Sequence, residues 1–211
     1  MLFILAYVDA VCFLGLFQTL TGYISVATIL LAAEICKEHG EVVPKIMVLI
    51  SYVPSTFMWV MLKEWYSGWR YFGSLLFVIE AGILTIFMVI ATNLSPLVGA
   101  EDPATMGIIV ISVLAMSLHN VHSLQVMPNK AQIAITGLFG NFASSIVHLL
   151  ALARTGKSTA TATAASRELL YPLIAFICGA FLGAFGFTSL GFIALICPIA
   201  ILIVMAVLSL A

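Results

Sequence analysis

Long apolar runs, separated by short polar gaps, are the feature that most constrains how this 211-residue chain can fold. Hydrophobic residues make up 63% of the sequence and charged residues only 8%, whereas a soluble domain uses about 25% charged residues. The mean hydropathy is +1.21. We therefore expect an all-α, polytopic transmembrane helical bundle, with residues 1–211 forming a single membrane domain whose outer surface faces lipid.

The apolar runs supply about six to eight helical segments of the roughly 20 residues that are needed to cross a bilayer. The run Leu2–Cys36 is too long for one crossing, so we expect a bend near residues 18–22, giving either two crossings or a re-entrant unit. The stretch 154–168 is rich in Ser, Thr and Ala and is typical of a flexible linker. The other segments are predicted at 46–62, 71–92, 106–127, 132–153, 170–187 and 191–210, and residues 37–45 are predicted to form a polar loop.

The two halves of the chain echo each other. A Leu-Ala pair and a later Thr-Gly pair occur at Leu5 and Thr21 in the first half and at Leu114 and Thr136 in the second. Duplication of this kind is common in transporters, where the solute site lies between the repeats. We expect an internal two-fold repeat, with residues 1–93 as the first unit, 94–105 as a linker and 106–211 as the second unit. The Lys and Arg distribution favours both termini in the cytoplasm.

Two acidic residues lie inside apolar segments. Asp9 is within the first run and Glu80 is in the middle of the fourth segment. A charged carboxylate at mid-membrane costs about 2.5–3.5 kcal/mol, so each group must be protonated, face a polar cavity or pair with another helix. Two interpretations stay open for both residues: a proton or cation site, and a structural carboxyl group hydrogen-bonded to a neighbouring helix.

Polar residues also recur at helical spacing in the second half. His119, His122 and Gln125 share one face of the fifth segment, and a proton relay, a polar solute path or simple interhelical hydrogen bonding would each explain them. The Thr-Gly pairs are predicted to break their helices beside this path. The candidate solute or ion pathway consists of Asp9, Gln18, Thr21, Gly22, Glu80, His119, Asn120, His122, Gln125, Thr136, Gly137, Asn141 and His148.

A stripe of small residues runs along the seventh segment at Ala175, Gly179 and Gly183. Small residues at every fourth position let membrane helices approach closely. We expect a packing face there, either within one chain or between two copies of it.

Several short motifs resemble those of the YoaK family, a group of small bacterial multi-pass membrane proteins of unknown function. That family carries Gly-x-x-Asp-Ala and then Thr-Gly-Asn, to which Ala6–Ala10 and Thr21–Tyr23 are similar, with Ala6 and Tyr23 departing from the pattern. Residues 115–120, Thr136-Gly137 and residues 176–184 resemble its later motifs, with Ser117 and His119 standing in place of Gly and Gln. The resemblance implies a multi-pass architecture, in the inner membrane if the source is bacterial. The family has no established activity, so the function must be argued from the residues.

A small transporter or permease for a small polar or ionic solute is the function that these residues favour, with Asp9 as the coupling carboxylate of a proton-linked cycle. The alternative is a non-transporting sensor or assembly subunit in which the polar groups only fix packing. No nucleophile elbow, Walker loop or zinc-protease motif occurs, so we expect no enzyme activity, metal or cofactor. A net charge of −1 without a basic patch excludes nucleic acid as a partner, which leaves the lipid bilayer, the solute and a possible second copy of the chain.

Overall fold

The computed structural model describes residues 1–37, 41–66, 68–126 and 160–210; the side chains of 124–126 and 160–170 are outside this description. Every regular element in these residues is a helix, which confirms the all-α expectation. The elements are α1 (Leu2–Gly15), α2 (Ile24–Ile35), α3 (Val42–Tyr66), α4 (Phe72–Leu94), α5 (Pro103–Val126), α7 (Ala160–Leu190), the 3₁₀ helix η1 (Gly191–Leu195) and α8 (Ile196–Leu208).

Four described stretches are long and apolar enough to cross a membrane: α3, α4, Pro103–Ser123 of α5, and Tyr171–Leu208, which runs from α7 into α8. Their outward side chains suit a lipid environment, since Phe181 and Phe185 on α7 expose 74% and 71% of their surfaces. The chain is therefore a membrane-embedded helical protein. The helices α1 and α2 have 14 and 12 residues, so each is shorter than the about 20 residues of a full crossing.

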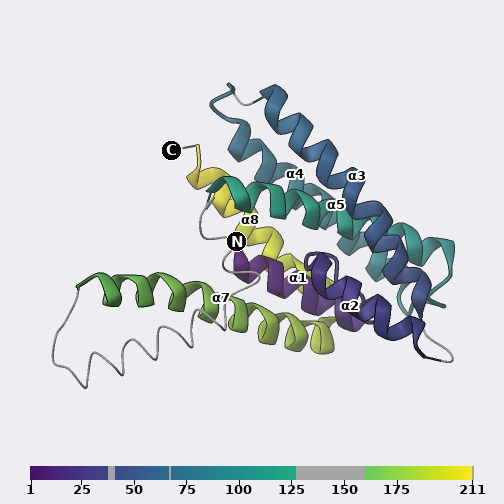
Figure 1. The fold of residues 1–211 in the computed structure, drawn as a ribbon. Coiled ribbons are helices and arrows are strands. Elements are labelled where there is room, and N and C mark those ends of the chain that lie inside the picture. The colour runs from purple at the N-terminus through teal and green to yellow at the C-terminus, as the bar shows by residue number, and fades with distance from the viewer. Residues whose placement is uncertain (38–40, 67, 127–159, 211) are drawn as a thin grey trace, which may run out of the picture.

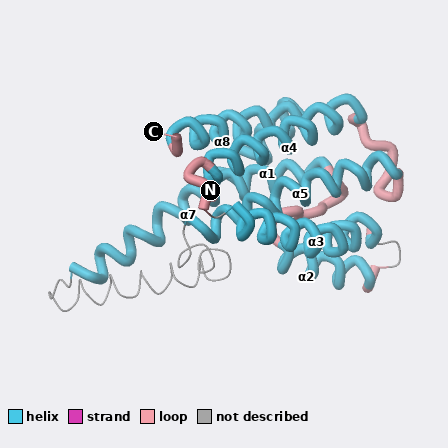
Figure 2. Tube along the Cα trace, turned by 90° about the horizontal axis from the view of Figure 1, so that it is seen from above, coloured by secondary structure: helices cyan, strands magenta, loops and turns pink. Residues whose placement is uncertain are grey.

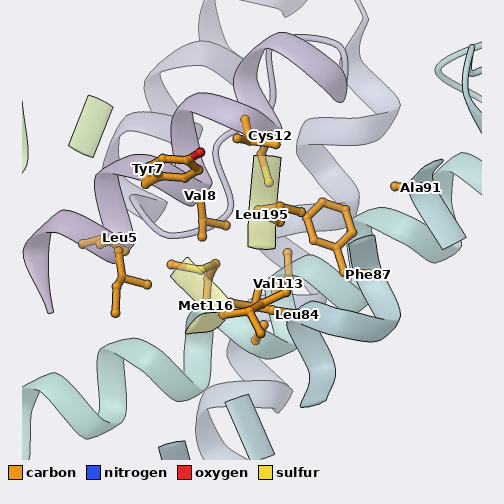
Figure 3. Close-up of a cluster of buried hydrophobic side chains, with 14 of the residues drawn as sticks. Leu5, Tyr7, Val8, Cys12, Leu84, Phe87, Ala91, Val113, Met116 and Leu195 are labelled. Atoms are coloured by element: carbon orange, nitrogen blue, oxygen red, sulfur yellow. The ribbon is translucent and has the colours of Figure 1, made fainter. Parts of the chain in front are cut away.

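The helices pack in pairs around α1 and α5 (Figures 1 and 2). α7 lies along α1, α3 lies along α5, and α4 contacts both α5 and α8. A cluster of buried side chains joins α1, α4, α5 and η1, and Figure 3 shows Val8, Phe87, Met116 and Leu195 within it. This apolar cluster fixes the position of α1 in the bundle, and α1 carries Asp9.

Glycines allow the close approach of α7 to α1. A Cβ atom at Gly183 would lie 2.5 Å from the carbonyl oxygen of Tyr7, and one at Gly179 would collide with the carbonyl oxygen of Phe3. Ala175, on the same helix, is half-buried. The predicted stripe of small residues therefore packs within one chain at its two glycines.

The structure differs from the sequence prediction at two boundaries. The predicted linker 154–168 is wrong from Ala160 onward, because α7 already begins there; Ala, Glu and Arg in this stretch are strong helix formers. The predicted loop 37–45 also ends early, since α3 begins at Val42 and includes Lys45. The segment predicted at 132–153 lies outside the described residues, and the repeat stays a prediction because its second Thr-Gly pair lies there too.

Candidate functional site

The connection between α1 and α2 reverses the chain inside the bundle. Phe17 and Gln18 adopt φ angles of 53° and 56°, a left-handed conformation that is costly for residues with a Cβ atom. The chain then folds back, so that residues 21–23 lie beside Asp9 instead of beyond the end of α1. The predicted bend near residues 18–22 is therefore present, as a tight loop that joins two short helices.

Asp9 holds this loop with both carboxylate oxygens. Oδ1 accepts hydrogen bonds from the backbone N–H groups of Thr21, at 3.0 Å, and Gly22, at 2.8 Å. Oδ2 accepts one from the backbone N–H of Tyr23, at 3.1 Å. Tyr23 is the N-cap residue of α2, so the carboxylate of one helix caps the positive end of the next. The side chain of Asp9 is buried and has polar partners on both oxygens.

The other loop residues divide into buried and exposed positions. The hydroxyl of Thr21 is buried and lies 3.4 Å from Oδ1 of Asp9 and 3.6 Å from the sulfur of Cys12. Gly22 leaves room for this contact, because a Cβ atom there would lie 3.1 Å from the carboxylate and would collide with Leu5. Gln18 is exposed. The structure therefore brings Asp9, Thr21 and Gly22 together and leaves Gln18 on the outside of the loop.

A second acidic group forms a buried pair with a histidine. Oε1 of Glu80 on α4 lies 2.6 Å from Nδ1 of His119 on α5, and neither side chain exposes more than 1% of its surface. Nε2 of the same imidazole lies 3.0 Å from the carbonyl oxygen of Met1. A carbonyl oxygen only accepts hydrogen bonds, so Nε2 must carry a hydrogen.

This hydrogen bond fixes how many protons the pair holds. With Nε2 protonated, the short contact to Glu80 contains one more proton, which resides either on Nδ1 or on the carboxyl group. The pair is an imidazolium with a carboxylate in the first case, and a neutral imidazole with a carboxylic acid in the second. Its total charge is zero in both cases, which explains how Glu80 can be placed inside the membrane.

Asn120 links the pair to the loop. Its Nδ2 donates to the carbonyl oxygen of Gly22, at 2.9 Å, and to the hydroxyl of Tyr52 on α3, at 3.0 Å. Because Asn120 follows His119 directly, α5 contacts the Glu80 pair and the loop with neighbouring side chains. One helix therefore connects the two polar groups that the sequence singled out.

Three atoms near this connection retain unused hydrogen-bonding capacity. They are Oε2 of Glu80, Oδ1 of Asn120 and Nδ1 of His122, each buried and without a hydrogen-bond partner within the described part of the chain. The His122 ring packs against Phe77, with the ring centroids 4.1 Å apart. Buried polar atoms of this kind are uncommon in folded proteins, so these side chains are candidates for contacts with a polar solute.

Lys45 is a site residue that sequence reasoning missed. Its side chain is 1% exposed, and Nζ donates to the carbonyl oxygens of Phe17 and Glu41, both at 3.1 Å. A carboxylate oxygen of Glu34 lies 3.8 Å away. The sequence feature that could have pointed to Lys45 is its position, four residues after Glu41, where a polar stretch meets an apolar run.

The remaining predicted residues belong to the parts that the structure leaves undescribed. Thr136, Gly137, Asn141 and His148 lie outside the described residues, and so does the side chain of Gln125, although its backbone is part of α5. Among the described residues, no three His, Cys, Asp or Glu side chains gather in a way that could hold a metal ion.

Comparison with known proteins places the chain in a family. A family described as "Protein of unknown function (DUF1275)" matches residues 1–208. No curated protein and no solved structure matches the chain. The family is uncharacterised, as the resemblance implied, and its description does not carry the name YoaK. Because the match covers almost all of the chain, this membrane protein belongs to the DUF1275 family.

Proposed function

We propose that the protein is a proton-linked transporter for a small polar or ionic solute, and that the Glu80–His119 pair carries the proton. The observation that supports this most is the 2.6 Å contact between two fully buried titratable groups, which holds a single proton. Ionisable residues inside membrane segments are rare, and they commonly mark proton relays and ion pathways.

The charge balance of the pair provides a reason for coupling. If the shared proton leaves, the pair becomes negatively charged in a low-dielectric interior, and that state is costly. A cationic solute, or a change in the exposure of the pair, would offset this cost. Proton loss and solute binding, or a shift of the helices, are therefore linked through the same buried charge.

Asp9 has a different role in this proposal from the coupling role that the sequence favoured. Both of its oxygens already accept backbone hydrogen bonds, and these bonds favour the charged carboxylate, so taking up a proton would weaken the contacts that hold the loop. We assign it to holding the α1–α2 loop. Broken helices line the solute sites of many transporters, because their free backbone groups can bind polar solutes.

Proton flux in reconstituted vesicles tests the proposal. Purified protein in proteoliposomes would be subjected to an imposed pH gradient and screened with small polar solutes, while a pH-sensitive dye reports the internal pH. Glu80→Gln keeps the shape and a hydrogen-bonding group but cannot release a proton, so solute-dependent proton movement should disappear. Glu101→Gln is the matched control, since Glu101 is exposed in the α4–α5 connection and should leave the flux unchanged.

The satisfied carboxylate of Asp9 favours a second candidate, a sensor or assembly subunit in which the polar groups only hold the helices together. This candidate predicts that no solute moves protons in the wild-type vesicles. It also predicts that Glu80→Gln alters only the stability of the protein. Equal flux in wild-type and Glu80→Gln vesicles would overturn the assignment of the proton to this pair.

A further inference from the structure

Lys45 places an ammonium group inside the protein beside the loop that follows α1. It is among the largest fully buried side chains of the described residues. Its Nζ atom is surrounded by three oxygen atoms from different segments: the carbonyl oxygens of Phe17 and Glu41, and a carboxylate oxygen of Glu34. A buried ammonium is costly unless its hydrogen bonds are satisfied, so this group of oxygens is what allows Lys45 to be buried.

The Phe17 carbonyl has no partner within a helix because α1 already ends at Gly15. Phe17 lies at the left-handed turn after α1. Where membrane helices unwind or end inside the bilayer, carbonyl groups at that point commonly coordinate a monovalent cation. Two carbonyl oxygens and a carboxylate oxygen can accept the three hydrogen bonds that an ammonium group donates, and carbonyl oxygens also coordinate Na⁺ in such sites.

We infer that these three oxygens form a monovalent-cation site that the tethered ammonium of Lys45 fills, and that this ammonium keeps the 16–23 loop closed over Cys12. The inference stands apart from the proposed transport function, because it concerns only the loop and its internal cation. Lys45 on α3 donates to a backbone carbonyl oxygen of the loop, that of Phe17. Asp9 on α1 accepts from backbone N–H groups of the same loop, including that of Gly22. The loop is therefore held by two opposite charges from two different helices.

Cys12 provides a native reporter for this loop. Its thiol is buried, and the Thr21 hydroxyl of the loop lies 3.6 Å from its sulfur. Changing the other three cysteines to serine (Cys36→Ser, Cys178→Ser and Cys197→Ser) leaves Cys12 as the single thiol. The rate at which methyl methanethiosulfonate labels the protein in detergent micelles then measures how often the loop opens.

The decisive variant is Lys45→Ala in this background. Loss of the charged hydrogen bonds should raise the labelling rate of Cys12 about tenfold or more. Propylammonium replaces the deleted part of the side chain, so adding it should restore slow labelling. Tetramethylammonium has the same charge but no N–H donor, and it should have no such effect.

Two further variants separate this role from general packing. Lys37→Ala is the matched control, because Lys37 bonds the same Glu34 at 2.8 Å but is 58% exposed; its labelling rate should stay at the parent value. Lys45→Met retains most of the side-chain volume and should label fast with or without propylammonium. The inference is overturned if Lys45→Ala labels no faster than the parent, or if propylammonium slows labelling no more than tetramethylammonium does.

Discussion

The amide nitrogen of Asn120 donates to the carbonyl oxygen of Gly22, 2.9 Å away and 98 residues earlier in the chain. This bond joins the C-terminal half of α5 to the loop that Asp9 holds. His119, the preceding residue, binds Glu80 on α4. A shift of α5 therefore acts at once on the loop and on the buried proton.

Substitution of Asn120 tests how strongly this connection holds the bundle. Asn120→Ala removes the bonds to Gly22 and Tyr52, and interhelical hydrogen bonds in membrane proteins average about 0.6 kcal/mol each. We expect the free energy of unfolding to fall by about 1–2 kcal/mol in a detergent-denaturant titration. Asn93→Ala is the control, because Asn93 is exposed and donates to the Val89 carbonyl oxygen of its own helix; an equal loss there would contradict a special role for Asn120.

Asp9 and Asp102 form a natural comparison between a buried and an accessible helix cap. Asp102 accepts from the backbone N–H groups of Ala104 and Thr105 at the start of α5. Asn caps helices about as well as Asp, so Asp102→Asn should change stability little. Asp9→Asn directs an NH₂ group at a backbone N–H group, because three amides surround the carboxylate. We expect Asp9→Asn, but not Asp102→Asn, to lower the free energy of unfolding by about 1–3 kcal/mol.

Thermal unfolding in detergent, followed by circular dichroism, measures this difference. The two aspartates share the same substitution and differ in burial and in the number of helices they join. If both variants unfold at the same temperature, the Asp9 carboxylate does not stabilise the loop in the way the contacts indicate.

Sequence patterns predicted the features that depend on local chemistry. The apolar runs predicted the membrane helices, and the Gln-Thr-Leu-Thr-Gly stretch at residues 18–22 predicted the break, because polar residues and glycine interrupt an otherwise continuous helix. The boundary before Gly191 was also predictable, and the structure shows a φ angle of 61° there, which glycine adopts without strain.

Pairings between distant segments could not be predicted in the same way. The pairing of Glu80 with His119 depends on the register of α4 against α5, which the periodicity of each helix alone does not contain. The burial of Lys45 depends on a loop 28 residues earlier in the chain that offers it a carbonyl oxygen. Composition misled at residues 160–168, where Ser and Thr suggested a linker and the intervening Ala residues favoured a helix.

The α1–α7 contact predicts opposite effects for two glycine substitutions. Gly183→Ala would place a methyl group 2.5 Å from the Tyr7 carbonyl oxygen, so the two helices must separate and stability should fall by about 1–3 kcal/mol. Gly82→Ala on α4 meets no atom of the described residues within 4 Å and should leave stability unchanged or raise it by up to about 1 kcal/mol. Unfolding of both variants in the same detergent measures the difference, and a loss at Gly82 as large as that at Gly183 would argue against the close contact.

The shared proton of Glu80 and His119 predicts strong coupling in a double-mutant cycle. Glu80→Leu leaves a buried imidazole without its carboxyl partner, and breaking one side of a buried ionisable pair costs about 3 kcal/mol or more. His119→Leu likewise leaves the buried carboxyl group of Glu80 without its imidazole partner. The combined variant removes both polar groups, so it should be no less stable than either single variant, which corresponds to a coupling energy of about 3 kcal/mol or more in unfolding titrations.

A second cycle provides the reference for this coupling. Glu80→Leu combined with Thr188→Ala should give additive losses within about 0.5 kcal/mol, because the Thr188 hydroxyl bonds Phe185 within the exposed part of α7. If the losses of Glu80→Leu and His119→Leu are additive as well, the two groups do not share a proton. Each group would then be stabilised by its own neighbours and not by the other group. Loss of a shared proton could not create the negative charge that the proposal uses to link proton movement to solute binding.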